Sequence, residues 1–333
     1  MPLPFILAGA ALAAAGYGVK KGIDAKDDFD IAEIYNHRAE RIYDEAKDKL
    51  EEARESTDKE LQSLGSLKVN IYQNSLKDFS DVFKKIKNID FENNLALGIL
   101  NSVDEQDVLD IQDTVLKMEE VLGGGIATLG SGALAGFGAL GGVGMLASAS
   151  TGTAIASLSG AAATNATLAW LGGGALSAGG FGMAGGMAVL GGIVAGPVLA
   201  VGGMMMASKA EEAKHTAYAN HDKAEAAAEQ MDSACVVLDG IYRRVEEFIE
   251  ILEPLDETFE EYIDELEDIV AKSTDWRVYT QEDKETVMKT ASIAKTVKNI
   301  CDAPIINKKG EVARKSKRVL KKAREFTEKL QEI

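Results

Sequence analysis

The stretch WLGGGALSAGGFGMAGGMAVLGGIVAG, Trp170 to Gly196, decides what kind of fold this chain can adopt. It carries no charged side chain, and most of its residues are glycine or alanine. Each glycine inside a helix costs roughly 0.5–1 kcal/mol relative to alanine, so an isolated helix of this composition is weak in water. The stretch therefore needs surroundings that favour close backbone packing.

The same composition continues on both sides of this stretch. Between Glu120 and Lys209 lie 88 residues without Asp, Glu, Lys, Arg or His, and they hold 25 of the 33 glycines. A membrane span needs only ~18–20 uncharged residues. A flexible linker is the alternative, but linkers are polar and rich in serine, whereas Leu, Ile, Val, Met and Phe recur here. We call residues 121–208 the charge-free tract and predict that it is a membrane-active helical region.

Glycines four residues apart predict how helices of this tract would pack. Such pairs place small surfaces on one helix face, where a second backbone can approach closely. The pairs are Gly132 and Gly136, Gly138 and Gly142, Gly182 and Gly186, and Gly192 and Gly196. We expect membrane crossings at Ile126 to Ala147 and Phe181 to Ala207, with the number of crossings left open. Asn165 is the only Asn, Gln or charged residue of the tract and is predicted to form a turn.

A first amphipathic arm, residues 23–120, precedes the tract. Apolar residues recur every three or four positions from 28 to 88, which predicts a heptad seam with Gly65 as its interruption. A shorter helix is expected from Asp104 to Leu122. Before this arm, residues 1–22 form a hydrophobic helix that is a retained membrane helix, a signal peptide or a packed helix.

A second, acidic arm, residues 209–303, follows the tract. The same apolar spacing predicts a helix from about Ala207 to Glu253, which Pro254 ends or kinks. A further helix is expected at Thr280–Cys301, and another at Gly310–Leu330 in the C-terminal region. Strand patterns are almost absent. The sequence therefore predicts an all-α fold: an elongated helical bundle or coiled-coil stalk with a Gly/Ala-rich, membrane-active head.

Residues 304–333 form a basic amphipathic helix in this interpretation. Its basic side chains include Lys315, Lys317, Arg318, Lys321, Lys322 and Arg324. The preceding arm has 12 acidic and no basic residues between Val245 and Ala271. The tail is therefore expected to contact either this acidic arm or anionic lipid.

Several classes of function are disfavoured by composition and spacing. A net charge of -17 argues against nucleic acid as a partner. The G-x-G-x-x-G match at Gly136 to Gly141 has no preceding strand, and His37, His215 and His221 lack metal-ligand spacing. Cys235 and Cys301 fit small core residues. We expect no enzyme activity, no cofactor and no bound metal.

The order of charged helical arms around a Gly/Ala-rich apolar middle resembles the α-helical pore-forming toxins of the cytolysin A and tripartite haemolysin kind. It is also similar to type III secretion translocators and to apolipoprotein L. No residue motif carries this resemblance, so no functional residue is transferred. It implies an apolar hairpin that is hidden against soluble helices and released at a membrane, and a bacterial source.

These patterns together predict a protein that inserts into lipid bilayers and associates with itself, forming a pore or lesion. A permanently embedded scaffold or remodelling partner without a pore is one alternative, and a soluble self-assembly module is another. A helical protein partner is also open. Lys117, Lys209 and Lys214 flank the tract, which predicts a membrane location with both arms on the cytoplasmic side. A secreted form that changes from soluble to inserted is the alternative.

Overall fold

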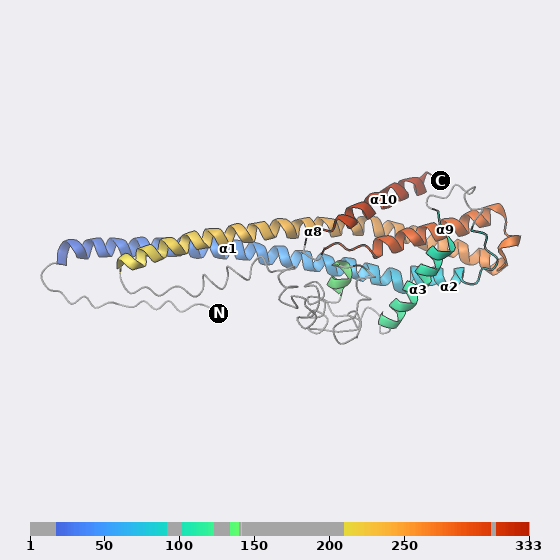
Figure 1. Ribbon diagram of the computed structural model, residues 1–333, viewed down its shortest axis with the longest axis horizontal. Coiled ribbons are helices and arrows are strands. Elements are labelled where there is room, and N and C mark those ends of the chain that lie inside the picture. The colour runs from blue at the N-terminus through green and yellow to red at the C-terminus, as the bar shows by residue number, and fades with distance from the viewer. Residues whose placement is uncertain are drawn as a thin grey trace. The chain divides into compact units, whose positions relative to one another are not determined.

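A computed structural model describes residues 18–91, 102–122, 134–139, 141, 210–307 and 311–332. Helix accounts for 87% of these residues, and they contain no strand beyond two isolated bridges. The predicted all-α class is therefore confirmed, and the helices form a bundle (Figure 1). Among the described residues, no helix combines the length and the apolar character that a membrane crossing needs. Asn165 and most of the two predicted crossings lie outside the described residues.

The first arm begins with two helices, α1 (Gly18–Gln73), which starts before the predicted boundary at residue 23, and α2 (Ser75–Phe83). The prediction that Gly65 interrupts this arm was wrong, because α1 passes through Gly65 and the break falls at Asn74, where φ is -115° and ψ is -91°. The side chain of Asn74 donates to Asn70 Oδ1 over 2.7 Å. Such local bonding by asparagine competes with helical geometry. The helix α3 (Glu105–Leu122) follows, close to its predicted bounds.

The second arm begins with one continuous helix, α8 (Ala210–Lys272), which has Pro254 inside it. Of the two predicted alternatives at Pro254, an end of the helix is therefore wrong, and a kink stays a prediction. A proline inside a helix costs ~3 kcal/mol because it removes one hydrogen bond and crowds the preceding turn. Leu252, Leu255 and Phe259 on either side are all buried, so their packing outweighs that cost.

The C-terminal third is built from a short 3-10 helix η5 (Trp276–Val278), α9 (Gln281–Cys301) and α10 (Arg314–Gln331). Thr280 caps α9, since its hydroxyl accepts from Asp283 N and the Asp283 carboxylate accepts from Thr280 N. This reciprocal bonding explains why α9 starts where the sequence predicts. The helix α9 contacts α2, α3 and α10.

The chain divides into two compact units. Unit 1 comprises residues 1–48 and 196–231, and its described part pairs the start of α1 with the start of α8. Lys214 Nζ lies 2.7 Å from Asp28 Oδ1, and the rings of Tyr35 and Tyr218 pack edge to face. Small side chains fill the seam, namely Ala32, Ala39, Ala46, Ala217, Ala224 and Ala227.

Unit 2 comprises residues 49–195 and 232–333 and holds a larger apolar core. The core takes side chains from the rest of α1 and α8 and from α2, α3, α9 and α10. Phe79, Phe248 and Phe259 are among its fully buried members. A short piece of the charge-free tract also belongs to this core, through Phe137 and Ala139.

Candidate functional site

Residues 134–139 and 141, within the first predicted crossing, are helical and packed into unit 2 (green in Figure 1). We call these residues the docked segment. Phe137 is fully buried, and its ring meets the ring of Tyr72 in α1 edge to face, with centroids 6.2 Å apart. Gly141 has a left-handed φ of 75°, and the predicted continuation of this helix to Ala147 lies outside the described residues. This part of the tract thus contacts the protein's own core.

Two glycines make this contact possible. A Cβ atom built on Gly65 of α1 would lie 1.9 Å from Leu134 O, and one built on Gly138 would lie 2.1 Å from Leu61 O. Neither position accepts a side chain while the two backbones stay where they are, because real Cβ contacts are essentially never shorter than 3.0 Å. The docked segment therefore crosses α1 at a glycine on each helix, as small residues allow.

The last carbonyl groups of the docked segment accept hydrogen bonds from the turn after α9 and from Lys68 of α1. Ala139 O accepts from the backbone N–H of Ile305 at 2.8 Å and of Ile306 at 3.3 Å, both in the turn after α9. Gly138 O accepts from Lys68 Nζ over 3.2 Å. The last carbonyls of a helix have no partner inside the helix, so these bonds satisfy groups that would otherwise be buried unpaired.

Lys68 is the unusual member of this site, because a fully buried lysine is rare without a carboxylate partner. Its ammonium contacts two carbonyls, Gly138 O and Ala303 O at 3.5 Å, and lies 5.5 Å from the centre of the Phe248 ring. Desolvation lowers the pKa of Lys68 to about 8, against the opposing charge of Asp302. The ammonium is still charged at pH 7, and its burial is costly.

Polar groups next to Lys68 are already engaged with one another. Tyr72 OH donates to Asp302 Oδ1 at 2.5 Å, and Lys298 Nζ donates to Asp302 Oδ2 at 2.7 Å. Burial raises the pKa of the Tyr72 phenol well above its ordinary value, and the Asp302 charge adds to this rise. Burial likewise raises the pKa of the Cys301 thiol. Asp302 thus takes its direct hydrogen bonds from Tyr72 and Lys298.

Asp256 of α8 is a buried carboxyl just beyond Pro254. Burial raises its pKa to about 6, the nearby Ser75 hydroxyl opposes this rise, and the charges of Glu260 and Glu257 add to it. Its Oδ1 atom has no hydrogen-bond partner among the described residues. Deprotonation of Asp256 therefore places a poorly compensated charge inside the bundle at neutral pH.

Of the glycines predicted to pack in a membrane, only Gly136 and Gly138 are described, and both are buried in the docked segment. Their observed neighbours include α1 of the same chain, which Gly138 meets at Leu61 and Gly65. The remaining predicted packing glycines lie outside the described residues, namely Gly132, Gly142, Gly182, Gly186, Gly192 and Gly196.

The basic residues predicted to contact the acidic arm or lipid are all exposed on α10: Lys315, Lys317, Arg318, Lys321, Lys322 and Arg324. Arg324 Nη2 lies 3.7 Å from Glu247 Oε1 of α8, so Arg324 contacts the acidic arm. The opposite face of α10 is apolar and buried, through Leu320, Ala323 and Phe326. Packing of that face, more than the exposed ion pair, is expected to hold α10 in place.

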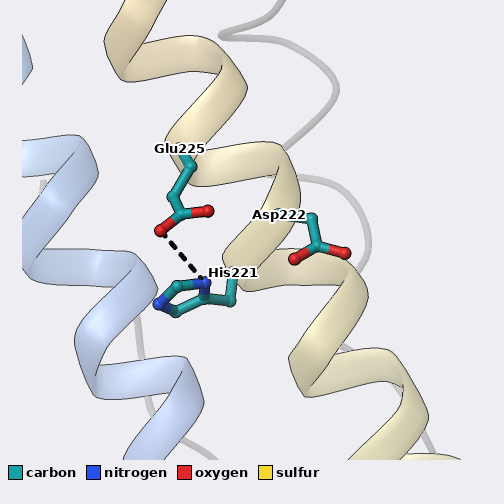
Figure 2. A group of neighbouring side chains, drawn as sticks. All are labelled: His221, Asp222 and Glu225. Atoms are coloured by element: carbon teal, nitrogen blue, oxygen red, sulfur yellow. Dashed lines mark ion pairs between the residues drawn. The ribbon is translucent and has the colours of Figure 1, made fainter.

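One group of side chains in unit 1 has donor atoms within 4.8 Å of one another: His221, Asp222 and Glu225. Figure 2 shows His221 and Glu225 turned toward each other, with His221 Nδ1 3.7 Å from Glu225 Oε1. All three residues come from one turn of α8, both carboxylates are exposed, and the described residues supply no donor from a second helix. We therefore assign no metal to this group.

Lys68 was missed from the sequence, although a signal was present. It lies four residues after Leu64 and four before Tyr72, on the face that the heptad seam buries. A charged residue at such a position predicts a polar partner inside the core.

Comparisons of the whole chain with protein families, with characterised proteins and with solved structures find no match.

Proposed function

We propose that this protein is a helical bundle that inserts its charge-free tract into lipid bilayers and associates with itself there. The composition of the tract carries the proposal: 88 consecutive uncharged residues, rich in glycine, stand between two long amphipathic arms. Burial of the docked segment in the core of unit 2 supports the proposal that the protein's own helices hold part of such a tract in water.

The proposed mechanism begins with release of the docked segment from α1. Release frees Gly138 from its contact with Gly65, so that the glycine faces of the tract can meet one another or those of a second copy. Helical hydrogen bonding satisfies the backbone in lipid, and the glycines let helices approach closely. In the more specific form of this proposal, the inserted protein forms a pore or membrane lesion. In the weaker form, it inserts and assembles without a pore.

A soluble self-assembly module is the second candidate, and one observation favours it. The Gly65–Gly138 crossing shows that glycines of the tract can be buried against the protein's own arm without lipid. In that case the glycine composition serves packing between helices in water. The two candidates differ in a single property, which is binding to a bilayer.

Flotation of the purified chain with liposomes, combined with release of an entrapped dye, separates the candidates. Soluble protein that floats with vesicles and releases dye supports insertion with a lesion, whereas flotation without release supports the weaker form. Protein that stays at the bottom of the gradient at every pH and every anionic lipid content removes the proposal and leaves the soluble module.

A set of variants tests the role of the glycines. Replacing Gly132, Gly136, Gly182 and Gly186 by leucine is expected to abolish assembly, because leucine keeps the backbones apart. Gly240→Ala is the matched control, since an added Cβ there meets only Val312 Cγ2 at an ordinary 3.7 Å. Normal oligomers from the leucine variant would refute packing through these glycines.

A further inference from the structure

We propose that the docked segment is poised for release because it covers the buried ammonium group of Lys68, which regains water when the segment leaves. This inference deepens the proposed function, since it names what favours the first step of insertion. The geometry of the covering contact carries it. Gly138 O lies 3.2 Å from Lys68 Nζ, so the docked segment sits directly on the charged group.

The ammonium is poorly compensated in the docked state. Two carbonyls and one aromatic ring surround it, and within the described residues no carboxylate lies within ion-pair distance. Asp302 is the acid whose charge acts on it, and Asp302 accepts its direct hydrogen bonds from Tyr72 and Lys298. Burying a charge without a paired partner is strongly unfavourable, so uncovering Lys68 is favourable.

Magnitudes indicate that this gain is comparable with the loss on the apolar side. A pKa lowered from 10.5 to about 8 corresponds to roughly 300-fold in the equilibrium constant for complete uncovering. Exposing the buried Phe137 opposes release by roughly 10- to 150-fold. The docked segment removes only part of the water from Lys68, because the side chain also passes through the core. We expect a net contribution from Lys68 of roughly tenfold toward release.

The sign of the pH dependence follows from linkage. The pKa of Lys68 is lower in the docked state than in water, so the neutral amine favours docking and the charged ammonium favours release. Docking should therefore strengthen as pH rises from 7 through 8 toward 9.5. The groups that face Lys68 from α1 and α9 do not obscure this window. Tyr72 and Cys301 have raised pKa values and stay neutral in this window.

The experiment measures docking directly, without lipid. Phe137 is replaced by 4-fluorophenylalanine, and fluorine NMR resolves its buried and exposed forms at a urea concentration where both are populated. The ratio of docked to released protein is expected to rise about tenfold between pH 7 and 9.5. In Lys68→Met this ratio is expected to be independent of pH over the same range. The exposed Lys59→Met is the matched control on α1 and should keep the rise.

Two results would overturn the inference. A ratio of docked to released protein that stays constant or falls with rising pH in the unmodified sequence would show that Lys68 does not favour release. This measurement does not depend on whether a Lys68 variant folds. A pH response that persists in Lys68→Met would assign it to another group. Vesicle binding is measured separately, so a protein that shows the pH response but never binds liposomes would refute the proposed function and leave this inference standing.

Discussion

The contact between Gly65 and the docked segment makes a prediction that opposes ordinary helix propensity. Gly65 lies inside α1, where alanine normally stabilises a helix by roughly 1 kcal/mol. In this structure the added Cβ would lie 1.9 Å from Leu134 O. An ordinary contact is about 3.4 Å or more, so the two backbones must separate by roughly 1.5 Å. A gap of only 0.5–1 Å already loses about a quarter to a half of the attraction between packed atoms.

The expected result of Gly65→Ala is release of the docked segment. Burial of Phe137 contributes roughly 1.5–3 kcal/mol to docking, and losing about half of this raises the released population by roughly 3- to 13-fold. Hydrogen exchange followed by mass spectrometry should show faster exchange in the peptides that contain residues 134–141. Gly138→Ala should give the same result from the other helix, because its Cβ would lie 2.1 Å from Leu61 O.

Gly240→Ala is the control for this comparison, since Gly240 also lies inside a helix but has room for a Cβ. It should leave exchange at residues 134–141 unchanged and stabilise α8 slightly. If Gly65→Ala exchanged as slowly as the unmodified protein, the two helices could not cross at Gly65. The account of the docked segment would then fail.

Three further predictions concern unit 2. Asp256 has a pKa of about 6 in the folded protein, above its ordinary value, so the free energy of unfolding should fall by roughly 1–3 kcal/mol as pH rises from 4 to 7, and Asp256→Asn should flatten this curve in urea titrations. Tyr72→Phe removes the donor to Asp302 and should lower stability by about 1.5–3 kcal/mol, measured by thermal unfolding at pH 7. Phe326→Ala should destabilise α10 by about 3–5 kcal/mol, whereas Arg324→Ala should change its stability by less than about 1 kcal/mol. The loss of helical signal in circular dichroism checks this order, and equal losses from the two variants would contradict it.

The sequence predicts the helices well where local signals and burial agree. The start of α9 follows from Thr280 and Asp283, which form a capping box, and the seam of α1 follows from its apolar spacing. The continuity of α1 through Gly65 and of α8 through Pro254 has a common cause. Both residues disfavour helix locally, but at each place tertiary packing outweighs local preference, through the crossing at Gly65 and the buried residues around Pro254.

The candidate site was harder to predict, because its parts are distant in sequence. Composition indicates that glycines of the tract pack closely, yet it does not indicate that Gly138 meets Gly65 of the first arm. The position of Lys68 in the seam predicts a buried polar contact without naming its acceptor. The acceptors are the backbone carbonyls of Gly138 and Ala303. Every residue has such a carbonyl, so the sequence does not indicate which ones accept.

Burial of Cys301 has a practical consequence. Its backbone carbonyl lies against Gly141, and its side chain is inaccessible in the docked state, whereas Cys235 on α8 is partly exposed. An alkylating reagent should therefore modify Cys235 first and reach Cys301 only after that part of the core opens. The unmodified chain therefore needs no added label site. The labelling of Cys301 relative to that of Cys235 reports opening of the core and corrects for differences in reagent concentration between samples.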